Sequence, residues 1–319
     1  GFRRGAGALN TILQENNLTD HPAFAQAKVR GIRALSGHSE TTDLTNDVNG
    51  GPSGVGIATA AGKAAFWDMM GADPSLKIIA VEGEFALTSG HSQEFKTQAV
   101  AQRVGKRLRV LMSYNNAGID DELIGSVVKE ESYDIANQWS AYGWNVIKVD
   151  NATDYDQVVG ALKAMEDWDE TDRRPMIVIG NTVKGFWPGA KNGMLPGGIT
   201  QVVDHASHAY GMPMNGDYFQ ALATSFEDKY GVTFEGIREG AVSDNRDRLI
   251  QLKTNIDIAL SVLDQDGLGD WLADRLVEIG DQVKEELPLK VQSEVDPFLD
   301  DRLRVENLPT EATTVTAEN

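Results

Sequence analysis

An acidic pair follows an apolar run in the first third of the chain. Residues 77–81 (KIIAV) are typical of a strand buried on both faces, and Glu82, Gly83 and Glu84 come directly after it, where we expect the strand to end. Carboxylates at the tip of a core strand can bind a cation. A solvated turn would place the same residue types there, so the acids alone leave both interpretations open.

A second polar pair follows another apolar run. Residues 108–114 (LRVLMSY) are followed by Asn115 and Asn116, although an Asn pair is also a common turn signal. Because ligands bind at the carboxyl ends of the strands in an open parallel sheet, we expect both strand ends to face one site. Carboxylate and amide oxygens suit Mg²⁺ or Ca²⁺, with a backbone carbonyl, water or phosphate oxygens completing the shell. Such a cation would offset the repulsion between a diphosphate and an acidic protein.

A glycine-rich stretch precedes a predicted helix. The run GGPSGVG at 50–56 contains Gly51, Pro52 and Gly54, which would let the backbone approach a ligand at the helix N-terminus. The run lacks the Lys-Ser or Lys-Thr end of a phosphate-binding P-loop, and it does not follow a clear strand as a dinucleotide-binding loop does. By itself it predicts only a close approach of the backbone.

The histidines offer proton transfer near neutral pH. His205 and His208, in the sequence HASH, are three residues apart and would share one face of a helix, although this spacing also fits polar loop histidines. His38 lies in the loop sequence SGHSE, and His91 is placed to cap or begin a helix.

Strand-like and helix-like segments alternate from residue 51 to 183, and this spacing predicts a doubly wound, mostly parallel α/β sheet with helices on both faces. Gly143 is expected to stop one helix, and Thr153 or Asp154 to cap the next. The predicted strands are residues 77–81, 108–114, 144–149 and 176–183. The predicted helices are residues 55–70, 91–105, 131–142 and 154–167.

The domain organisation follows from changes in composition. We expect an α/β domain over residues 1–216, whose last part, 184–216, is a loop rich in Gly and Pro and hence functional or disordered. A helical extension is expected over residues 217–290, and a linker or tail over 291–319. Because the sequence begins with Gly, we expect a processed or truncated piece.

Charge and composition narrow the class of protein. The net charge of -19 disfavours nucleic acid and anionic membranes as partners. The sequence has 0 cysteines, which excludes disulfides and thiolate metal sites and fits a cytoplasmic location. We see neither the apolar core of a signal peptide nor an apolar run of the roughly 18 residues that a membrane span requires.

The order and spacing of these motifs resemble the diphosphate-binding domain of transketolase-like thiamine diphosphate enzymes over about residues 35–215. The matching segments are GHSE (37–40), which resembles the family's Gly-His-Pro-Glu; GGPSGVGIATAAGKA (50–64), its glycine loop and helix; AYGWNVIKV (141–149), its Tyr-Gly-Trp strand entry; NTVKGFWPG (181–189), its Thr-Val/Ile-x-Gly-Phe/Tyr; and HASHAYGMP (205–213), its His-x-x-His-Gly-x-Pro.

The resemblance implies a magnesium site at the strand ends. The family's Gly-Asp-Gly aspartate binds Mg²⁺, and the alignment that we favour gives its role to Glu82, as in an Asp-Gly-Glu variant of the family. An alignment anchored on SGHSQE gives the role to Glu84 instead. The resemblance also implies Asn116 and the carbonyl of Gly118 as ligands, whereas anchoring on the Gly-Ile pair would put Ala117 at the amide position.

The resemblance further implies thiamine diphosphate and Mg²⁺ (or Ca²⁺) as cofactors. The histidines implied to face substrate are His38, His205 and His208. The implied cofactor contacts are Gly51, Pro52, Gly54, Gly83, Glu84, Asn115, Gly118 and Ile119.

The implied activity is transfer of a two-carbon ketol unit, with this chain supplying the diphosphate and metal half of the active site. We find no second sheet domain, so a pyrimidine-binding domain would come from a partner chain or from the remainder of the polypeptide, in an oligomer acting on a small molecule. Two alternatives are an E1-type 2-oxo acid dehydrogenase or decarboxylase component and a non-catalytic relative. A plain nucleotide-binding α/β protein is a weaker third.

Overall fold

The computed structural model describes residues 12–24, 48, 54–119, 134–168, 171–208 and 210–286. By its contacts the chain divides into two compact units, residues 1–272 and 273–319, and each is described by itself. The sheet and the helices packed on it belong to the first unit. The described part of the second unit is the C-terminal portion of helix α10 (Leu268–Glu286).

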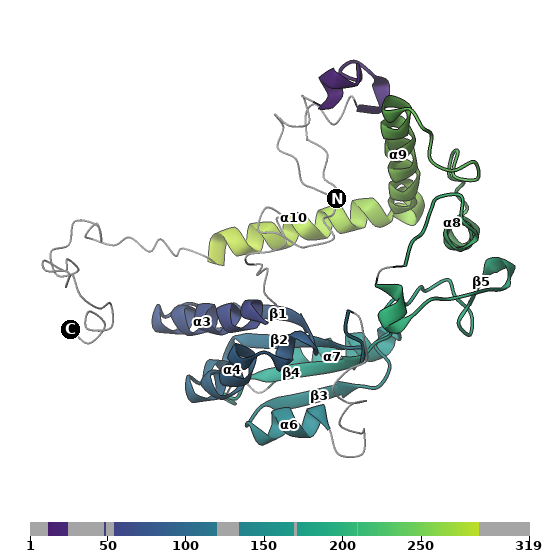
Figure 1. Ribbon diagram of the computed structural model, residues 1–319. Helices are drawn as coiled ribbons and strands as arrows, with labels where there is room; N and C mark the ends of the chain where they lie inside the picture. Colours follow the sequence, from purple (N-terminus) through teal and green to yellow (C-terminus); the bar gives the residue numbers. More distant parts are fainter. Residues whose placement is uncertain are drawn as a thin grey trace, which may run out of the picture. The chain divides into compact units, whose positions relative to one another are not determined.

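A four-stranded sheet forms the core of the first unit (Figure 1). Its strands all run parallel, in the order β1-β2-β4-β3, which confirms the predicted parallel α/β fold. The strands are β1 (Ile78–Gly83), β2 (Leu108–Tyr114), β3 (Asn145–Val149) and β4 (Met176–Asn181). The carboxyl ends of β1, β2 and β4 are therefore neighbours along one edge of the sheet.

Strand β1 extends two residues further than its apolar run. Glu82 pairs with Met112 and Gly83 with Ser113, so the predicted strand end at residue 81 was wrong. Pairing with a central strand overrides the low strand propensity of Glu and Gly. Glu82 therefore lies inside the strand, and Glu84 is the first residue beyond it.

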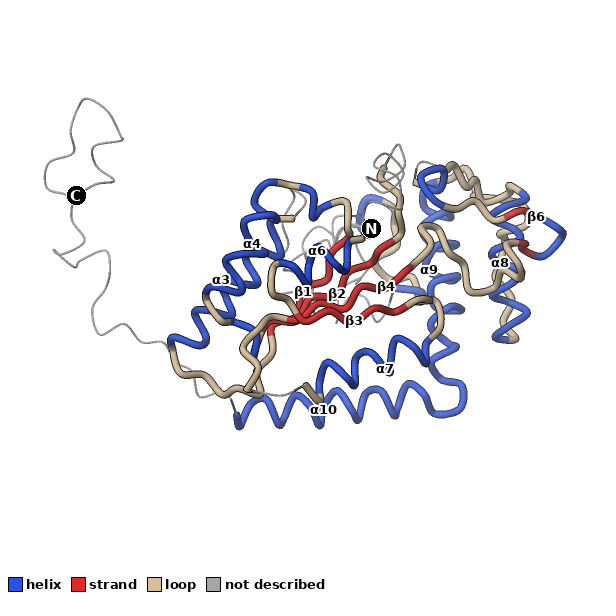
Figure 2. The backbone as a smooth tube through the Cα atoms, turned by 90° about the horizontal axis from the view of Figure 1, so that it is seen from below, coloured by secondary structure: helices blue, strands red, loops and turns tan. Residues whose placement is uncertain are grey.

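Helices cover both faces of the sheet, as predicted. Helices α3 (Val55–Met69), α4 (Gly90–Ala101) and α6 (Ile135–Ala141) pack on one face around a core that includes Phe95, Trp139 and Trp144. Figure 2 shows α7 (Tyr155–Glu166) on the opposite face, where it packs against β3 and β4. As expected, Asp154 caps α7 through its side chain, and Gly143 adopts a left-handed conformation after α6.

Irregular chain and further helices follow β4. The predicted loop 184–216 contains two short antiparallel strands, β5 (Met194–Leu195) and β6 (Ile199–Thr200). The predicted helical extension is interrupted, since α8 (Asp217–Tyr230) ends at the left-handed Gly231, and α9 (Asn245–Leu260) and α10 follow it. The 3-10 turns are η1 (Pro22–Phe24), η2 (Ala86–Thr88), η3 (Val104–Lys106), η5 (Pro196–Gly198), η6 (Asp204–Ser207) and η7 (Ser261–Gly267).

A small separate apolar cluster joins the N-terminal region to α9. Leu13, Leu18 and Phe24 are buried and pack with Leu249 and Ile250 of α9. None of the helices described here is both long and apolar enough to cross a membrane.

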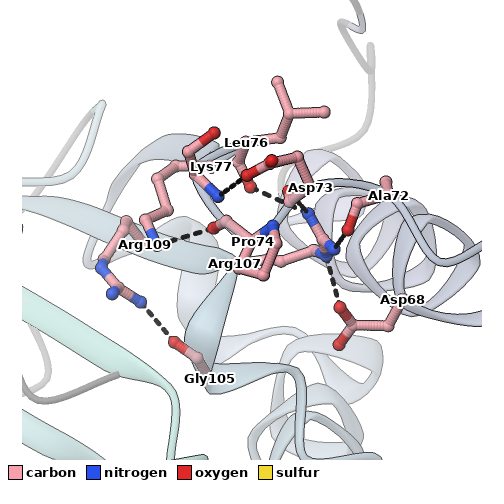
Figure 3. A network of polar contacts seen from close by, with 10 residues as sticks. Asp68, Ala72, Asp73, Pro74, Leu76, Lys77, Gly105, Arg107 and Arg109 are labelled. Atoms are coloured by element: carbon pink, nitrogen blue, oxygen red, sulfur yellow. Dashed lines mark hydrogen bonds and ion pairs between the residues drawn. The ribbon is translucent and has the colours of Figure 1, made fainter. Parts of the chain in front are cut away.

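A buried arginine organises the amino-terminal edge of the sheet (Figure 3). Arg107 is 1% exposed and forms an ion pair with Asp68 near the end of α3. Its guanidinium also donates hydrogen bonds to the carbonyls of Ala72, Asp73 and Leu76 in the turn that leads into β1. Carbonyls of the turn that follows α3 thus receive charged donors, which stabilises the α3–β1 connection.

Candidate functional site

The carboxyl ends of β2 and β4 are fastened to each other. The backbone N–H of Thr182 donates to the carbonyl of Tyr114 at 2.9 Å, and the hydroxyls of Ser113 and Thr182 are 2.8 Å apart. With β1 paired on the other side of β2, three loops meet at this edge. The predicted site residues after β1 and β2 are therefore brought to one edge of the sheet.

Glu84 lies directly beyond β1 and is only 4% exposed. Burial raises the pKa of its carboxyl, while the backbone N–H groups of Asn115, Asn116 and Ala117 oppose this shift by favouring the ionised form. The carboxylate of Glu84 therefore faces the turn after β2. Its Oε1 atom is buried and has no hydrogen-bond partner among the described residues.

The two asparagines after β2 differ in what their side chains do. Oδ1 of Asn115 accepts the N–H of Ala117 at 3.0 Å and is used within the turn. Asn116 has a left-handed backbone, with φ of 55°, a conformation that Asn tolerates better than most residues. Its Oδ1 is buried and, in the described part of the chain, has no hydrogen-bond donor. Asn116 thus has an amide oxygen available for a ligand.

These two orphan oxygens fit a bound cation. A buried acceptor without a donor is costly, and native proteins usually satisfy such atoms with a partner, a water or an ion. One carboxylate oxygen and one amide oxygen from adjacent strand ends are the hard ligands that Mg²⁺ and Ca²⁺ select. Among the described residues no cluster of three or more acidic or histidine side chains is placed for a metal, so further ligands would come from backbone, water or the anion itself.

Glu82 has different surroundings from Glu84. Its Oε2 is 3.9 Å from the position that a Cβ would occupy on Gly56, in the first turn of α3. The side chain is half-buried, and burial raises the pKa of its carboxyl, opposed by the N–H of Gly83 and the charge of His91. Glu82 therefore lies beside the N-terminus of α3, whereas Glu84 faces the β2 turn.

A lysine that the sequence did not single out reaches this site. Lys184 follows β4, and its ammonium donates a hydrogen bond to the carbonyl of Gly118, the predicted backbone ligand for the metal. The two residues are 66 positions apart. The sequence does show a lysine shortly after the buried strand β4, but it does not show that the partner of this lysine is the Gly118 carbonyl.

The start of α3 is packed tightly against the β1–α4 connection. Gly54 is buried and has φ of +82°. A Cβ there would lie 2.7 Å from the carbonyl oxygen of Ala86 and closer still to the hydroxyls of Ser89 and Ser92. Only Gly fits this position, so Gly54, the N-cap of α3, packs directly against the chain that follows β1.

The remaining predicted residues are more peripheral or lie outside the described residues. His205 and His208 are exposed and lie in and just after the turn η6, in which the N–H of His208 donates to the carbonyl of His205. Ile119 is 59% exposed beyond the β2 turn. The predicted sites at His38, Gly51 and Pro52 fall outside the described residues.

The fold and the strand-end oxygens together define an α/β domain suited to a metal-bound anionic ligand. The family described as "Transketolase, thiamine diphosphate binding domain" matches residues 24–205, more than half of the chain, and the chain belongs to this family. The family match confirms the resemblance and its thiamine diphosphate-binding character.

The chain is similar to parts of curated transketolases. A transketolase from Streptococcus pyogenes is 30% identical over 159 residues, covering 47% of this chain and 21% of that protein. One from Halalkalibacterium halodurans is 25% identical over 202 residues, covering 61% of this chain and 27% of that protein. The chain thus spans about a fifth to a quarter of the length of these relatives.

Solved transketolases give matches of limited extent. A transketolase variant from Pichia stipitis in complex with fructose-6-phosphate aligns with a TM-score of 0.47 and 21% identity, covering 78% of this chain and 34% of that chain. The transketolase from Campylobacter jejuni aligns with a TM-score of 0.46 and 19% identity, covering 74% and 35%.

Proposed function

We propose that this chain supplies the diphosphate- and metal-binding half of a thiamine diphosphate-dependent two-carbon (ketol) transferase of transketolase type. The observation that carries the proposal is the pair of buried, unpartnered oxygens, Glu84 Oε1 and Asn116 Oδ1, on adjacent strand ends of a domain in this family. A cation between them would remove a desolvation cost that the fold otherwise bears.

In this proposal Glu84, Asn116 and the carbonyl of Gly118 hold Mg²⁺ or Ca²⁺. We favour Glu84 over Glu82, the ligand that the sequence alignment favoured, because Glu84 faces the β2 turn while Glu82 lies beside α3. When bound, thiamine diphosphate supplies the carbon nucleophile for moving a two-carbon unit between carbonyl compounds. The chain's own contribution is to hold the diphosphate and to exclude water from the buried carboxylate.

The histidines complete the proposal on the substrate side. His205 and His208 lie on an exposed turn, from which an imidazole can donate to substrate oxygens or transfer a proton near neutral pH. His38 retains this role from the family resemblance alone.

A pyrimidine-binding domain would complete the active site, from a partner chain or from the remainder of a longer polypeptide. This part of the proposal is supported by the lengths of the curated relatives, of which the chain spans only 21% to 27%. An oligomer in the cytoplasm, acting on a small molecule, remains part of the proposal.

A second candidate function is a non-catalytic relative that does not hold the metal tightly. The observation that favours it is the ammonium of Lys184 on the Gly118 carbonyl, since a cation already bonds to a predicted metal ligand. The longer Glu in place of the family's Asp points in the same direction.

The test uses the native preparation with every copurifying chain retained. We expect thiamine diphosphate to bind in calorimetric titrations only when Mg²⁺ is present, and the preparation to exchange two-carbon units between sugar phosphates. Decarboxylation of a 2-oxo acid with transfer to a lipoyl group would favour the E1-type alternative. If a pyrimidine-binding chain is present and thiamine diphosphate still fails to bind, the non-catalytic relative is the correct reading.

A further inference from the structure

Lys184 links two of the three loops at the carboxyl edge of the sheet. Its side chain is partly buried and bonds to the Gly118 carbonyl beyond β2. No carboxylate among the described residues forms an ion pair with it, unlike several arginines of the same chain. Although the protein is acidic, the ammonium of Lys184 therefore bonds to a neutral carbonyl oxygen and not to a carboxylate.

The backbone beneath Lys184 is held in place. The carbonyl of Lys184 accepts the N–H of Asp204 at 2.9 Å, and the side chain of Gln201 donates to the carbonyl of Gly185 at 2.7 Å. Gly185 has φ of +79°, and a Cβ there would lie 2.6 Å from that of Ser207. Only the flexible stem of Lys184 is free to change direction, since its backbone is fixed against the 201–207 segment.

Two cations do not share one carbonyl oxygen readily. Mg²⁺ draws its ligands to about 2.1 Å and requires near-octahedral geometry, which places it against the lone pairs that the ammonium now uses. Their like charges repel in a partly buried site, where water screens them poorly. A metal that takes the Gly118 carbonyl must therefore displace the ammonium of Lys184.

We propose that Lys184 is a positioning residue that holds the Gly118 carbonyl in the metal-free chain and competes with Mg²⁺ for it. The inference rests on the proposed function, since it takes the strand-end oxygens as the metal site. An anion such as diphosphate gives the displaced ammonium a new partner. Lys184 thereby lowers the affinity for Mg²⁺ when no anion is bound and lowers it less when the anion is present. The metal and the anion therefore bind cooperatively.

The test is calorimetric titration of Mg²⁺ alone into the whole chain and its variants. Lys184→Met and Lys184→Gln remove the competing charge, and we expect both to bind Mg²⁺ at least about threefold more tightly than the wild type. Lys184→Arg keeps a cation and should match the wild type. Lys191→Met is the matched control, because it removes an exposed lysine from the same post-β4 segment. Structural damage in a variant would weaken Mg²⁺ binding. A higher affinity for Mg²⁺ in the Lys184 variants therefore indicates that Lys184 competes with the metal.

A second titration with inorganic diphosphate present measures the coupling. The wild type should gain more Mg²⁺ affinity from diphosphate than Lys184→Met does. The inference is overturned if Lys184→Met and Lys184→Gln bind Mg²⁺ alone no more tightly than the wild type, while Glu84→Gln loses binding as the proposed function requires. If neither the wild type nor the Lys184 variants bind Mg²⁺ even with diphosphate present, the proposed function fails and the inference fails with it.

Discussion

The two edges of the same sheet differ in whether their buried polar groups have partners. At the amino edge, Arg107 pairs with Asp68 and donates to three carbonyls of the turn after α3, so its buried charge has both a counter-ion and hydrogen-bond acceptors. At the carboxyl edge, the oxygen atoms Glu84 Oε1 and Asn116 Oδ1 are also buried, but they have no hydrogen-bond partner in the described chain. The first edge stabilises the fold, whereas the second leaves two buried acceptor oxygens open to a water or a cation.

The largest expected effect is at the amino edge. Arg107→Met should lower the free energy of unfolding by about 3–5 kcal/mol, because it removes the buried ion pair with Asp68 and the guanidinium hydrogen bonds to the carbonyls of Ala72, Asp73 and Leu76. Denaturant titration measures the change. Arg173→Met, which removes an exposed arginine near the same edge, should shift stability by less than about 0.5 kcal/mol. Equal losses in the two variants would refute the stabilising role of the Arg107 network.

The second prediction concerns the tight packing of Gly54 at the start of α3, near the carboxyl edge of the sheet. Gly54→Ala is expected to cost about 2–4 kcal/mol, because a side chain at φ of +82° is strained and its Cβ would press on the Ala86 carbonyl. Gly62→Ala, in the same α3 helix with open space around it, provides the comparison and should be neutral or stabilising. Thermal unfolding of both variants decides this, and a neutral Gly54→Ala would mean that the α3 start is loosely packed.

Lys96 is a buried cation that forms no ion pair with a carboxylate of the described residues, in contrast to Arg107. Lys96 is 1% exposed, donates to the side chains of Gln93 and Gln138 at 3.0 Å, and lies 4.8 Å from the centre of the Trp139 ring. Burial lowers its pKa to about 8 from the ordinary 10.5.

The sign of the pH dependence of Lys96 follows from proton counting. Between pH 8 and 10.5 the unfolded chain binds more protons at this site than the folded chain, so stability rises with pH. Relative to Lys96→Met, the wild type should gain at most about 3 kcal/mol across this range. Urea titrations at pH 7.5 and 10.5 test it, and a difference that is constant or falls with pH contradicts the burial of a charged lysine.

The smallest expected change in stability is that of Glu84→Gln, and its sign is opposite to that of Arg107→Met. Without metal, Glu84→Gln should raise the free energy of unfolding by about 1 kcal/mol, because it removes a buried charge that lacks a cation. Glu94→Gln, at an exposed position on α4, should leave it unchanged. A loss of more than about 1 kcal/mol in Glu84→Gln would indicate that the carboxylate serves the fold rather than a ligand.

The sequence predicted the strands and helices well where apolar runs and caps are local. It placed four parallel strands, the Asp154 cap and the Gly143 stop, because each depends on neighbouring residues. It ended β1 too early, since the pairing of Glu82 with Met112 depends on a strand 30 residues away in the chain. The helical extension was predicted only as one region, 217–290, and the bounds of the three described helices within it, α8, α9 and α10, were not predicted.

The candidate site was predicted in part. Carboxylate and amide residues at the strand ends could be found from polar residues that follow apolar runs. The choice between Glu82 and Glu84 could not, because it depends on which side chain faces the β2 turn. The Lys184–Gly118 contact depends on β2 and β4 being neighbours, an order that alternation along the chain does not specify.

The most direct test of a ligand-binding carboxyl edge is calorimetric titration of inorganic diphosphate into the chain with and without Mg²⁺. Diphosphate avoids any need for a pyrimidine-binding domain. We predict Mg²⁺-dependent binding by the wild type, at least about tenfold weaker binding by Glu84→Gln, and near-wild-type binding by Glu82→Gln and Glu94→Gln. Binding by Glu84→Gln as tight as that of the wild type would contradict the assignment of the unpartnered oxygens to a metal-bound diphosphate.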